Sequence, residues 1–344
     1  NKIITQIIEK NKKKEYKHLR DLRKNLLLGI KLKKALNLTN SSEVENILTQ
    51  IVYNTPNPLD QKYKIFFLYK LWSKGDNKST FNEFIHKINS EFEKYQRGEE
   101  SEFKEIVDKR KKDLIAQLTK ENDVKNTEYS GISEFIKISQ GNARSFILML
   151  KKAIEFARIR GEKPLDEGGR ISLDSQYLAV YDTARWFYED AELVGEEGKN
   201  IYTCLKRLAE CFILERFCDK PVETTVSCFY LRAEGLSEKA LQCIEIMKLH
   251  SIIIEDSAGR IEKNTGRKER LFQINKVLAP LGNLPTVVSG SISLNKAYAE
   301  SIFNPDCNAE FDKIYKQRKS ELNAPTFRKP TKGKNMTENS LFLI

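Results

Sequence analysis

Residues 141–144 read Gly-Asn-Ala-Arg and place a cation where the physics of a helix disfavours one. Gly141-Asn142 is a helix start signal, and apolar residues follow it at helical spacing. These apolar residues are Phe146, Ile147, Leu148, Met149, Leu150 and Ile154. Arg144 is therefore predicted in the first turn, where the positive end of the helix dipole costs a cation about 0.3–1 kcal/mol. A cation at that position needs an explanation.

Other patterns that would carry catalysis are absent from the sequence. There is no G-x-x-x-x-G-K-[ST] phosphate loop, and GEEGKN at residues 195–200 has the wrong glycine spacing and an Asn where a magnesium-binding hydroxyl is needed. SIIIED at residues 251–256 resembles a strand followed by a magnesium-binding acid, but we interpret it as a plain strand because a hairpin follows it. The three histidines are scattered. The chain alone has no complete catalytic site.

The cysteines indicate structural thiols. None of the six lies in a CxxC pair, which excludes the usual zinc sites. Cys204, Cys211 and Cys218 are seven apart, so they are predicted unpaired and buried on one face of one helix in a reducing, cytoplasmic environment. The chain has neither a secretory signal nor an apolar run of membrane-spanning length. It begins with Asn1, and we expect an upstream region.

Positive charge is concentrated at both ends of the chain. Residues 1–34 hold 12 Lys and Arg against 3 Asp and Glu, and residues 313–344 hold 8 against 2. The middle of the chain is slightly acidic, although the whole carries a net charge of +11. Such ends can bind phosphate backbones by releasing counterions. The alternative is that they are solvated helix faces and a flexible tail.

The expected fold is mainly α. Residues 1–160 read as helices throughout, and residues 161–169, which contain Pro164, Gly168 and Gly169, predict a boundary. Residues 161–285 are interpreted as a winged helix-turn-helix domain. Residues 286–325 are interpreted as a C-terminal extension, and residues 326–344 as a basic flexible tail.

Within the second half, helices at 221–231 and 236–249 would form the helix-turn-helix pair. Residues 251–256 and 271–275 would pair as an antiparallel hairpin whose tip contains Gly259 and Gly266, and residues 256–270 would form the wing.

Candidate nucleic-acid contacts lie in the wing and at the N-terminal end. The helix at 236–249 contains no arginine to read guanine, so we expect phosphate contact rather than sequence recognition. The candidates are Lys12, Lys13, Lys14, Arg260, Lys263, Arg267, Lys268 and Arg270. The alternatives are that the wing is a solvated turn and that the helix contacts protein.

The chain resembles the C-terminal half of origin-recognition-like AAA+ ATPases over residues 125–325. GNARSFILMLKKA is similar to the start of a lid helix in that family. Further blocks are similar to prokaryotic members, including those of phage-defence loci: WFYEDAELVGEEGKNIY, ERFCDKPVE, IEKNTGR and INKVLAPLGNLP. The first hundred residues match only in being helical. The family's phosphate loop and Walker acid are absent from this chain.

The resemblance implies a helical lid and a winged helix that work with ATP and Mg²⁺. It gives Arg144, with Asn142, the role of a nucleotide sensor that reaches the terminal phosphates, which would compensate its dipole position. The alternative is an exposed arginine at a frayed helix end. ATP hydrolysis requires a phosphate-loop core upstream or in a partner. The implied partners are DNA, another protein, or further copies through the AAA+ module, with no membrane. A non-enzymatic DNA-binding adaptor and a structural assembly subunit are the alternative functions.

Overall fold

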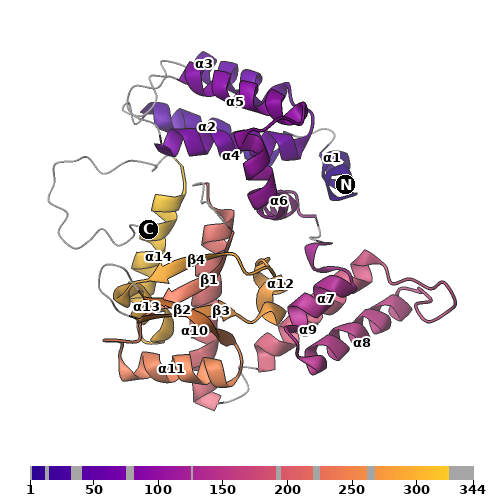
Figure 1. Ribbon diagram of the computed structural model, residues 1–344, viewed down its shortest axis with the longest axis vertical. Coiled ribbons are helices and arrows are strands. Elements are labelled where there is room, and N and C mark those ends of the chain that lie inside the picture. Colours follow the sequence, from indigo (N-terminus) through magenta and orange to yellow (C-terminus); the bar gives the residue numbers. More distant parts are fainter. Residues whose placement is uncertain are drawn as a thin grey trace. The chain divides into compact units, whose positions relative to one another are not determined.

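The computed structural model describes residues 2–11, 15–31, 41–74, 81–124, 127–190, 195–219, 225–261 and 268–324 (Figure 1). The fold is mainly α with one small sheet, as the sequence predicts. The chain divides into two compact units. Unit 1 comprises residues 1–126, 217–224 and 318–333, and unit 2 comprises residues 127–216, 225–317 and 334–344.

Unit 1 is built from helices. They are α1 (Lys2–Lys10), α2 (Lys17–Lys31), α3 (Ser41–Leu48), the π-helical turn η1 (Thr49–Tyr53), α4 (Pro58–Lys74), α5 (Phe81–Gln96) and α6 (Glu102–Glu121). Proline suits the first position of α4, and Ser101 caps α6 by accepting a hydrogen bond from the Lys104 N–H. The core includes an edge-to-face contact between Phe67 and Phe103, whose ring centres are 5.1 Å apart.

Unit 2 begins with a layer of helices that lie side by side in Figure 1. They are η2 (Thr127–Tyr129), α7 (Ile132–Ser139), α8 (Ala143–Ile159) and α9 (Leu173–Asp190). The long helix α10 (Gly195–Phe217) follows and packs against the sheet, where Phe212 meets Phe229. The boundary that the sequence predicts near residue 160 falls inside this unit.

The remaining elements of unit 2 surround a four-stranded sheet. They are β1 (Val226–Leu231), α11 (Glu238–Leu249), β2 (Ile253–Ile261), β3 (Lys268–Ile274), η4 (Lys276–Leu278), α12 (Ala279–Gly282), β4 (Gly290–Leu294), α13 (Lys296–Phe303) and α14 (Asn308–Leu322), whose residues from 318 onward belong to unit 1. The strand order is β2-β3-β1-β4, with β1 antiparallel to β3 and parallel to β4.

The predicted hairpin is confirmed, because β2 and β3 pair antiparallel with Ile253 opposite Ile274. The pairing is irregular between Asp256 and Arg260, and Gly259 lies in that stretch of β2. Gly266 lies outside the described residues.

The helix predicted at residues 221–231 is wrong. Residues 226–231 form β1, a central strand whose residues are buried or partly buried, and residues 221–224 lie outside the described part of the chain. Val226, Phe229 and Tyr230 of β1 are β-branched or aromatic, which suits a strand held by neighbours on both sides. The helix predicted at residues 236–249 is confirmed as α11, which Ser237 caps by accepting from the Ala240 N–H.

The apolar face predicted for α8 is only partly right, because Met149 is buried but Ile147 is exposed. Ser145, Met149, Ala153 and Ala157 are buried, whereas Phe146, Leu148, Leu150 and Ile154 are only partly buried. Small residues on the buried face allow α7 and α9 to approach α8 closely. The side chain of Lys152 forms an ion pair with Asp182 of α9 at the edge of this contact.

All six cysteines are free thiols, as predicted, and all but Cys307 are buried. Cys204 and Cys211 lie on α10, but Cys218 follows the last residue of that helix.

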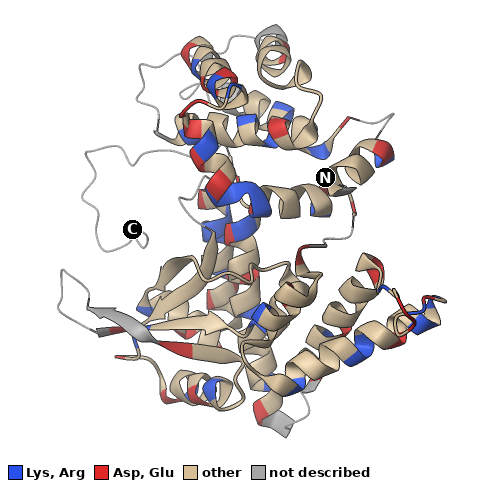
Figure 2. Ribbon diagram, turned by 45° about the vertical axis from the view of Figure 1, so that its right-hand side comes forward, with Lys and Arg blue, Asp and Glu red and all other residues tan. Residues whose placement is uncertain are grey.

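No helix within the described ranges is long and apolar enough to cross a membrane. Figure 2 shows Lys and Arg interspersed with Asp and Glu along the described helices of both units.

Candidate anion-binding arginine and strand hairpin

The turn before α8 places Arg144 at an open helix start. Helix α7 ends at Gln140, whose φ of 49° is left-handed, and Gly141 follows with a φ of 82°. Glycine suits the second position because it adopts this conformation without strain. The Asn142 side-chain oxygen then accepts a hydrogen bond from the Ser145 N–H at 3.2 Å and caps α8. The prediction that Arg144 lies in the first turn is confirmed.

Arg144 keeps its charge available to a partner. Its side chain is exposed, and its guanidinium carbon lies 5.4 Å from the centre of the Trp186 ring on α9. Among the described residues, none forms a hydrogen bond or ion pair with Arg144. A cation over an indole face is attracted to the ring without being neutralised. The structure therefore holds a positive charge at the helix start, open to an incoming anion.

Exposed apolar side chains lie on the same helices. Ile147 follows Arg144 by three residues, on the same side of α8, and is 61% exposed. On α7, Ile132 and Ile136 are one turn apart and are each 57% exposed. These isoleucines leave apolar surface on α7 and α8 that another body could cover.

On the hairpin, Arg270 is already engaged. Its guanidinium donates two hydrogen bonds to the carboxylate of Glu255, at 2.6 and 2.5 Å, and lies 3.7 Å from Glu245. The hydrogen bond with Glu255 raises the pKa of Arg270, and it holds the pKa of Glu255 at about 2. Arg270 is therefore a poorer phosphate contact than the sequence suggests, because the pair must open first.

The other predicted nucleic-acid contacts are placed only in part. In the paired strands β2 and β3, Arg260 lies opposite Glu269, and Lys268 lies opposite Ile261. The side chains of Arg260 and Lys268 lie outside the described part of the structure. The remaining candidates lie outside the described residues: Lys12, Lys13, Lys14, Lys263 and Arg267.

The helix before the hairpin, α11, presents an acidic stripe to solvent. Its exposed residues are Glu238, Gln242, Glu245 and Leu249, which share one face at helical spacing. Its two lysines are paired: Lys239 with Asp306 at 2.7 Å and Lys248 with Glu245 at 2.9 Å. This face is poorly suited to the DNA backbone.

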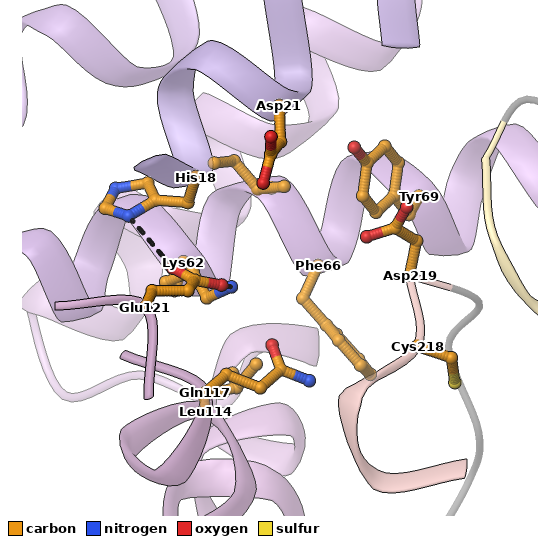
Figure 3. Close-up of a pocket in the computed structure, with 11 residues that line it drawn as sticks. His18, Asp21, Lys62, Phe66, Tyr69, Leu114, Gln117, Glu121, Cys218 and Asp219 are labelled. Carbon is orange, nitrogen blue, oxygen red and sulfur yellow. Dashed lines mark hydrogen bonds and ion pairs between the residues drawn. The ribbon is translucent and has the colours of Figure 1, made fainter. Parts of the chain in front are cut away.

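Unit 1 contains a polar pocket that sequence reasoning missed (Figure 3). Its volume is about 40 Å³, and its polar lining comes from α2, α4, α6 and the segment after α10. Lys62 Nζ lies 2.7 Å from Glu121 Oε1, and the buried His18 Nδ1 lies 3.6 Å from Glu121 Oε2. Three separate helices contribute His18, Lys62 and Glu121, so no local sequence motif predicts that these residues lie together.

The pKa values of two partly buried carboxyls in this pocket shift in opposite directions. Burial raises the pKa of Glu121, but the charge of Lys62 and the neighbouring His18 outweigh it and hold that pKa at about 2. Burial also raises the pKa of Asp219, which the more distant Lys62 offsets only in part. No group of His, Cys, Asp and Glu within the described ranges is arranged to hold a metal ion.

Comparison with known families supports the origin-recognition resemblance. A family model described as ORC-CDC6-like matches residues 1–294. The chain belongs to the ORC-CDC6-like family. It is thus a relative of the origin-recognition-like AAA+ ATPases. No curated protein and no solved structure matches the chain.

The match corrects the extent of the resemblance. The sequence motifs place the likeness at residues 125–325, and the first hundred residues resemble the family only in being helical. The family model begins at residue 1 and ends with β4, so the helices of unit 1 belong to the family region and α13 and α14 lie beyond it.

Proposed function

We propose that the chain is the regulatory part of an AAA+ ATPase of the ORC-CDC6-like family, in which α7, α8 and α9 form a nucleotide-sensing lid. The observation that carries the proposal is Arg144: an exposed arginine at a capped helix start, held over Trp186 and without an ionic partner among the described residues. The exposed isoleucines of α7 and α8 fit a lid that closes on another body.

The residues present fit the terminal phosphates of ATP better than they fit the metal. A guanidinium can bind two phosphate oxygens at once, and the open first turn of α8 supports negative charge. Asn142 already uses its side-chain oxygen as the helix cap, which leaves its amide N–H groups as donors. Mg²⁺ would be held by the phosphate-loop core that this sequence lacks, upstream or in a partner. Arg144 would sense the γ-phosphate, and the departure of that phosphate on hydrolysis would release the lid.

Trp186 provides a direct test. The chain has two tryptophans, and a Trp72→Phe background leaves Trp186 as the single reporter. ATP with Mg²⁺ is titrated into the native protein while the fluorescence of Trp186 is recorded. We expect a saturable change, because the phosphate draws the guanidinium from the ring. Arg144→Ala has no guanidinium over the ring and gives no such signal, so its ATP affinity is measured by isothermal titration calorimetry. We expect this substitution to weaken ATP binding roughly tenfold to hundredfold, the value of a hydrogen bond to a charged group.

Arg185→Ala is the matched control. Arg185 is an exposed neighbour of Trp186 on α9 and pairs with Glu189 at 2.6 Å. The Arg185→Ala variant should bind ATP like the parent. Equal ATP affinity in the parent and in Arg144→Ala, or the absence of any response in the parent, would contradict the sensor.

A second function, DNA binding through the hairpin, is supported by element order. A helix, a strand, a helix and an antiparallel hairpin follow one another in α10, β1, α11, β2 and β3, and β1 pairs with β3. This order resembles that of a winged helix but lacks the first helix of the predicted helix-turn-helix pair, because residues 226–231 form β1. In this arrangement the hairpin would be the wing. We propose that DNA contact runs through the hairpin rather than through α11, whose exposed face is acidic. The proposed role in antiphage defence rests on the sequence resemblance alone.

A further inference from the structure

The segment that leaves the hairpin is bonded to both ends of α7. At its C-terminal end, the Gln140 side-chain oxygen accepts a hydrogen bond from the Lys276 N–H at 2.8 Å. Near its N-terminal end, the hydroxyl of Thr286 donates to Glu134 Oε2 at 3.1 Å. Helix α7 and the segment 275–286 are therefore joined at two points within unit 2.

One of these bonds joins the base of the hairpin to the turn that carries Arg144. Asn275 follows β3; its N–H donates to the carbonyl of Ile252 at 2.9 Å, and its side chain donates to the carbonyl of Ser251 at 2.8 Å. The next residue is Lys276, whose N–H binds Gln140. Two residues after Gln140 comes Asn142, the cap of α8. Hydrogen bonds and short stretches of backbone thus link the hairpin base to the start of α8.

Gln140 holds this position at a conformational cost. Its φ of 49° is left-handed, a region that a glutamine seldom adopts. Such strain persists only where surrounding contacts enforce it. The bond to Lys276 is one such contact, since it fixes the side chain of the residue at which α7 stops.

We propose that Gln140 is a positioning residue that couples anion binding at Arg144 to the base of the β2–β3 hairpin. The proposal rests on the nucleotide-sensing function of Arg144. An anion that draws Arg144 from Trp186 shifts the first turn of α8, and the bond from Gln140 to Lys276 transmits that shift to Asn275 and the hairpin. Coupling of this kind is reciprocal, so a ligand on the hairpin would also change the affinity of Arg144 for its anion.

Three substitutions distinguish loss of the hydrogen bond between Gln140 and Lys276 from a change in the backbone conformation of residue 140. Gln140→Asn keeps a residue that tolerates a positive φ but is one methylene too short to reach Lys276. Gln140→Glu keeps both the length and the acceptor oxygen, and should rescue the coupling. Gln176→Ala is the matched control, because Gln176 accepts from the Gly131 N–H at 2.7 Å, at the opposite end of α7 from Lys276.

The experiment compares two readouts in the native protein with ATP and Mg²⁺. Trp186 fluorescence reports binding at Arg144, and amide hydrogen exchange of residues 252–256 and 270–276 reports the hairpin base. In the parent, in Gln140→Glu and in Gln176→Ala, ATP should change exchange there by at least about fivefold, the lower end of coupling between sites. In Gln140→Asn, the fluorescence response should remain while the exchange response falls toward none.

Each result decides between the two proposals. A retained exchange response in Gln140→Asn would overturn the coupling and leave the sensor standing. A parent that gives no fluorescence response to ATP would overturn the sensor, and the coupling with it. Without ATP, Gln140→Asn should already speed hydrogen exchange of the Lys276 N–H. An unchanged rate there would show that the hydrogen bond from Lys276 to Gln140 does not hold the segment after β3 in place.

Discussion

At the scale of single residues, Arg207 shows how a buried cation is accommodated among neutral oxygens. Its guanidinium donates to the carbonyls of Ser301, Asn304 and Pro305 and to the side-chain oxygen of Asn308, at 2.6–3.0 Å. The carbonyls at the end of α13 lack partners within that helix, and the negative end of its dipole favours a cation. Arg207 thereby fixes the connection between α13 and α14.

We expect Arg207→Lys to lower the free energy of unfolding by about 2–3 kcal/mol, because an ammonium cannot reach all four oxygens and leaves some of them buried without a donor. Urea denaturation measures this change. Lys206→Met is the control, since Lys206 is the exposed neighbour on α10 and its replacement should change stability by less than about 0.5 kcal/mol. Equal stability of parent and Arg207→Lys would show that Arg207 is dispensable.

Glu121 makes stability depend on pH in the acid range. Its pKa is about 2 in the folded state against an ordinary 4.5, so the folded state releases this proton more readily than the unfolded chain. The resulting stabilisation of about 3 kcal/mol is present above pH 4.5 and is lost as the pH falls toward 2. Glu121→Gln should lose stability at pH 7 and differ progressively less from the parent as the pH falls. Urea titrations at several pH values measure both trends.

Two variants control this prediction. Glu105→Gln lies on the same helix in an exposed pair with Lys109, and should show little change at any pH. Asp219→Asn should show the opposite sign, because the raised pKa of Asp219 means that its proton stabilises the fold and is lost as the pH rises through that pKa. If the parent's advantage over Glu121→Gln stayed constant with pH, the carboxylate would not be the cause.

At the scale of elements, the helices and the hairpin could be predicted from local pattern, but β1 and the buried face of α8 could not. Residues 221–231 begin with Pro221, which favours a helix start, yet β1 is fixed by β3 and β4, which lie far along the chain from it. The hydrophobic pattern of α8 marks its largest side chains, whereas close helix packing selects its smallest. Both failures have one cause: the deciding partner is distant in sequence.

The same applies to the candidate sites. The sequence predicts Arg144 at a helix start because cap, glycine and cation are neighbours along the chain. Trp186, Gln140 and the bond to Lys276 could not be predicted, since each joins residues that only folding brings together. No sequence pattern indicates that Trp186, on a later helix, lies under Arg144.

The buried face of α8 gives a test at this scale. Ala153→Leu should destabilise the protein by about 1–3 kcal/mol, because a fully buried alanine between packed helices leaves no room for the larger side chain. Ile147→Ser, at an exposed position of the same helix, should stay within about 0.5 kcal/mol. Thermal or urea unfolding distinguishes them. The reverse order would restore the apolar face predicted from the sequence.

At the scale of the whole molecule, charge is divided between the chain's ends and its middle. Residues 1–34 hold 12 Lys and Arg against 3 Asp and Glu, so we expect DNA binding through the phosphate backbone, which is weak. The exposed acidic stripe of α11 is poorly suited to reading bases, so we expect little sequence preference. Alanine at Lys12, Lys13, Lys14, Arg267 and Lys268 should reduce the salt dependence of affinity, by about one unit of slope for each phosphate that is no longer neutralised. Arg270→Ala should have less effect, because Glu255 already binds Arg270. Titration of duplex DNA at two salt concentrations measures this, and tight salt-resistant binding would contradict it.

The discontinuity of unit 1 has a consequence for the order in which the protein matures. Asn25 of α2 donates to Asp219, and Asp219 in turn accepts from the N–H of Ala324. A ribosome that has made residues 1–126 must still translate residues 127–317 before the last part of the unit exists. At about 5–20 residues per second this takes on the order of 10–40 s. During that interval the nascent helices of unit 1 lack their closing segment. A premature stop before residue 318 would therefore damage helices that were translated well before it.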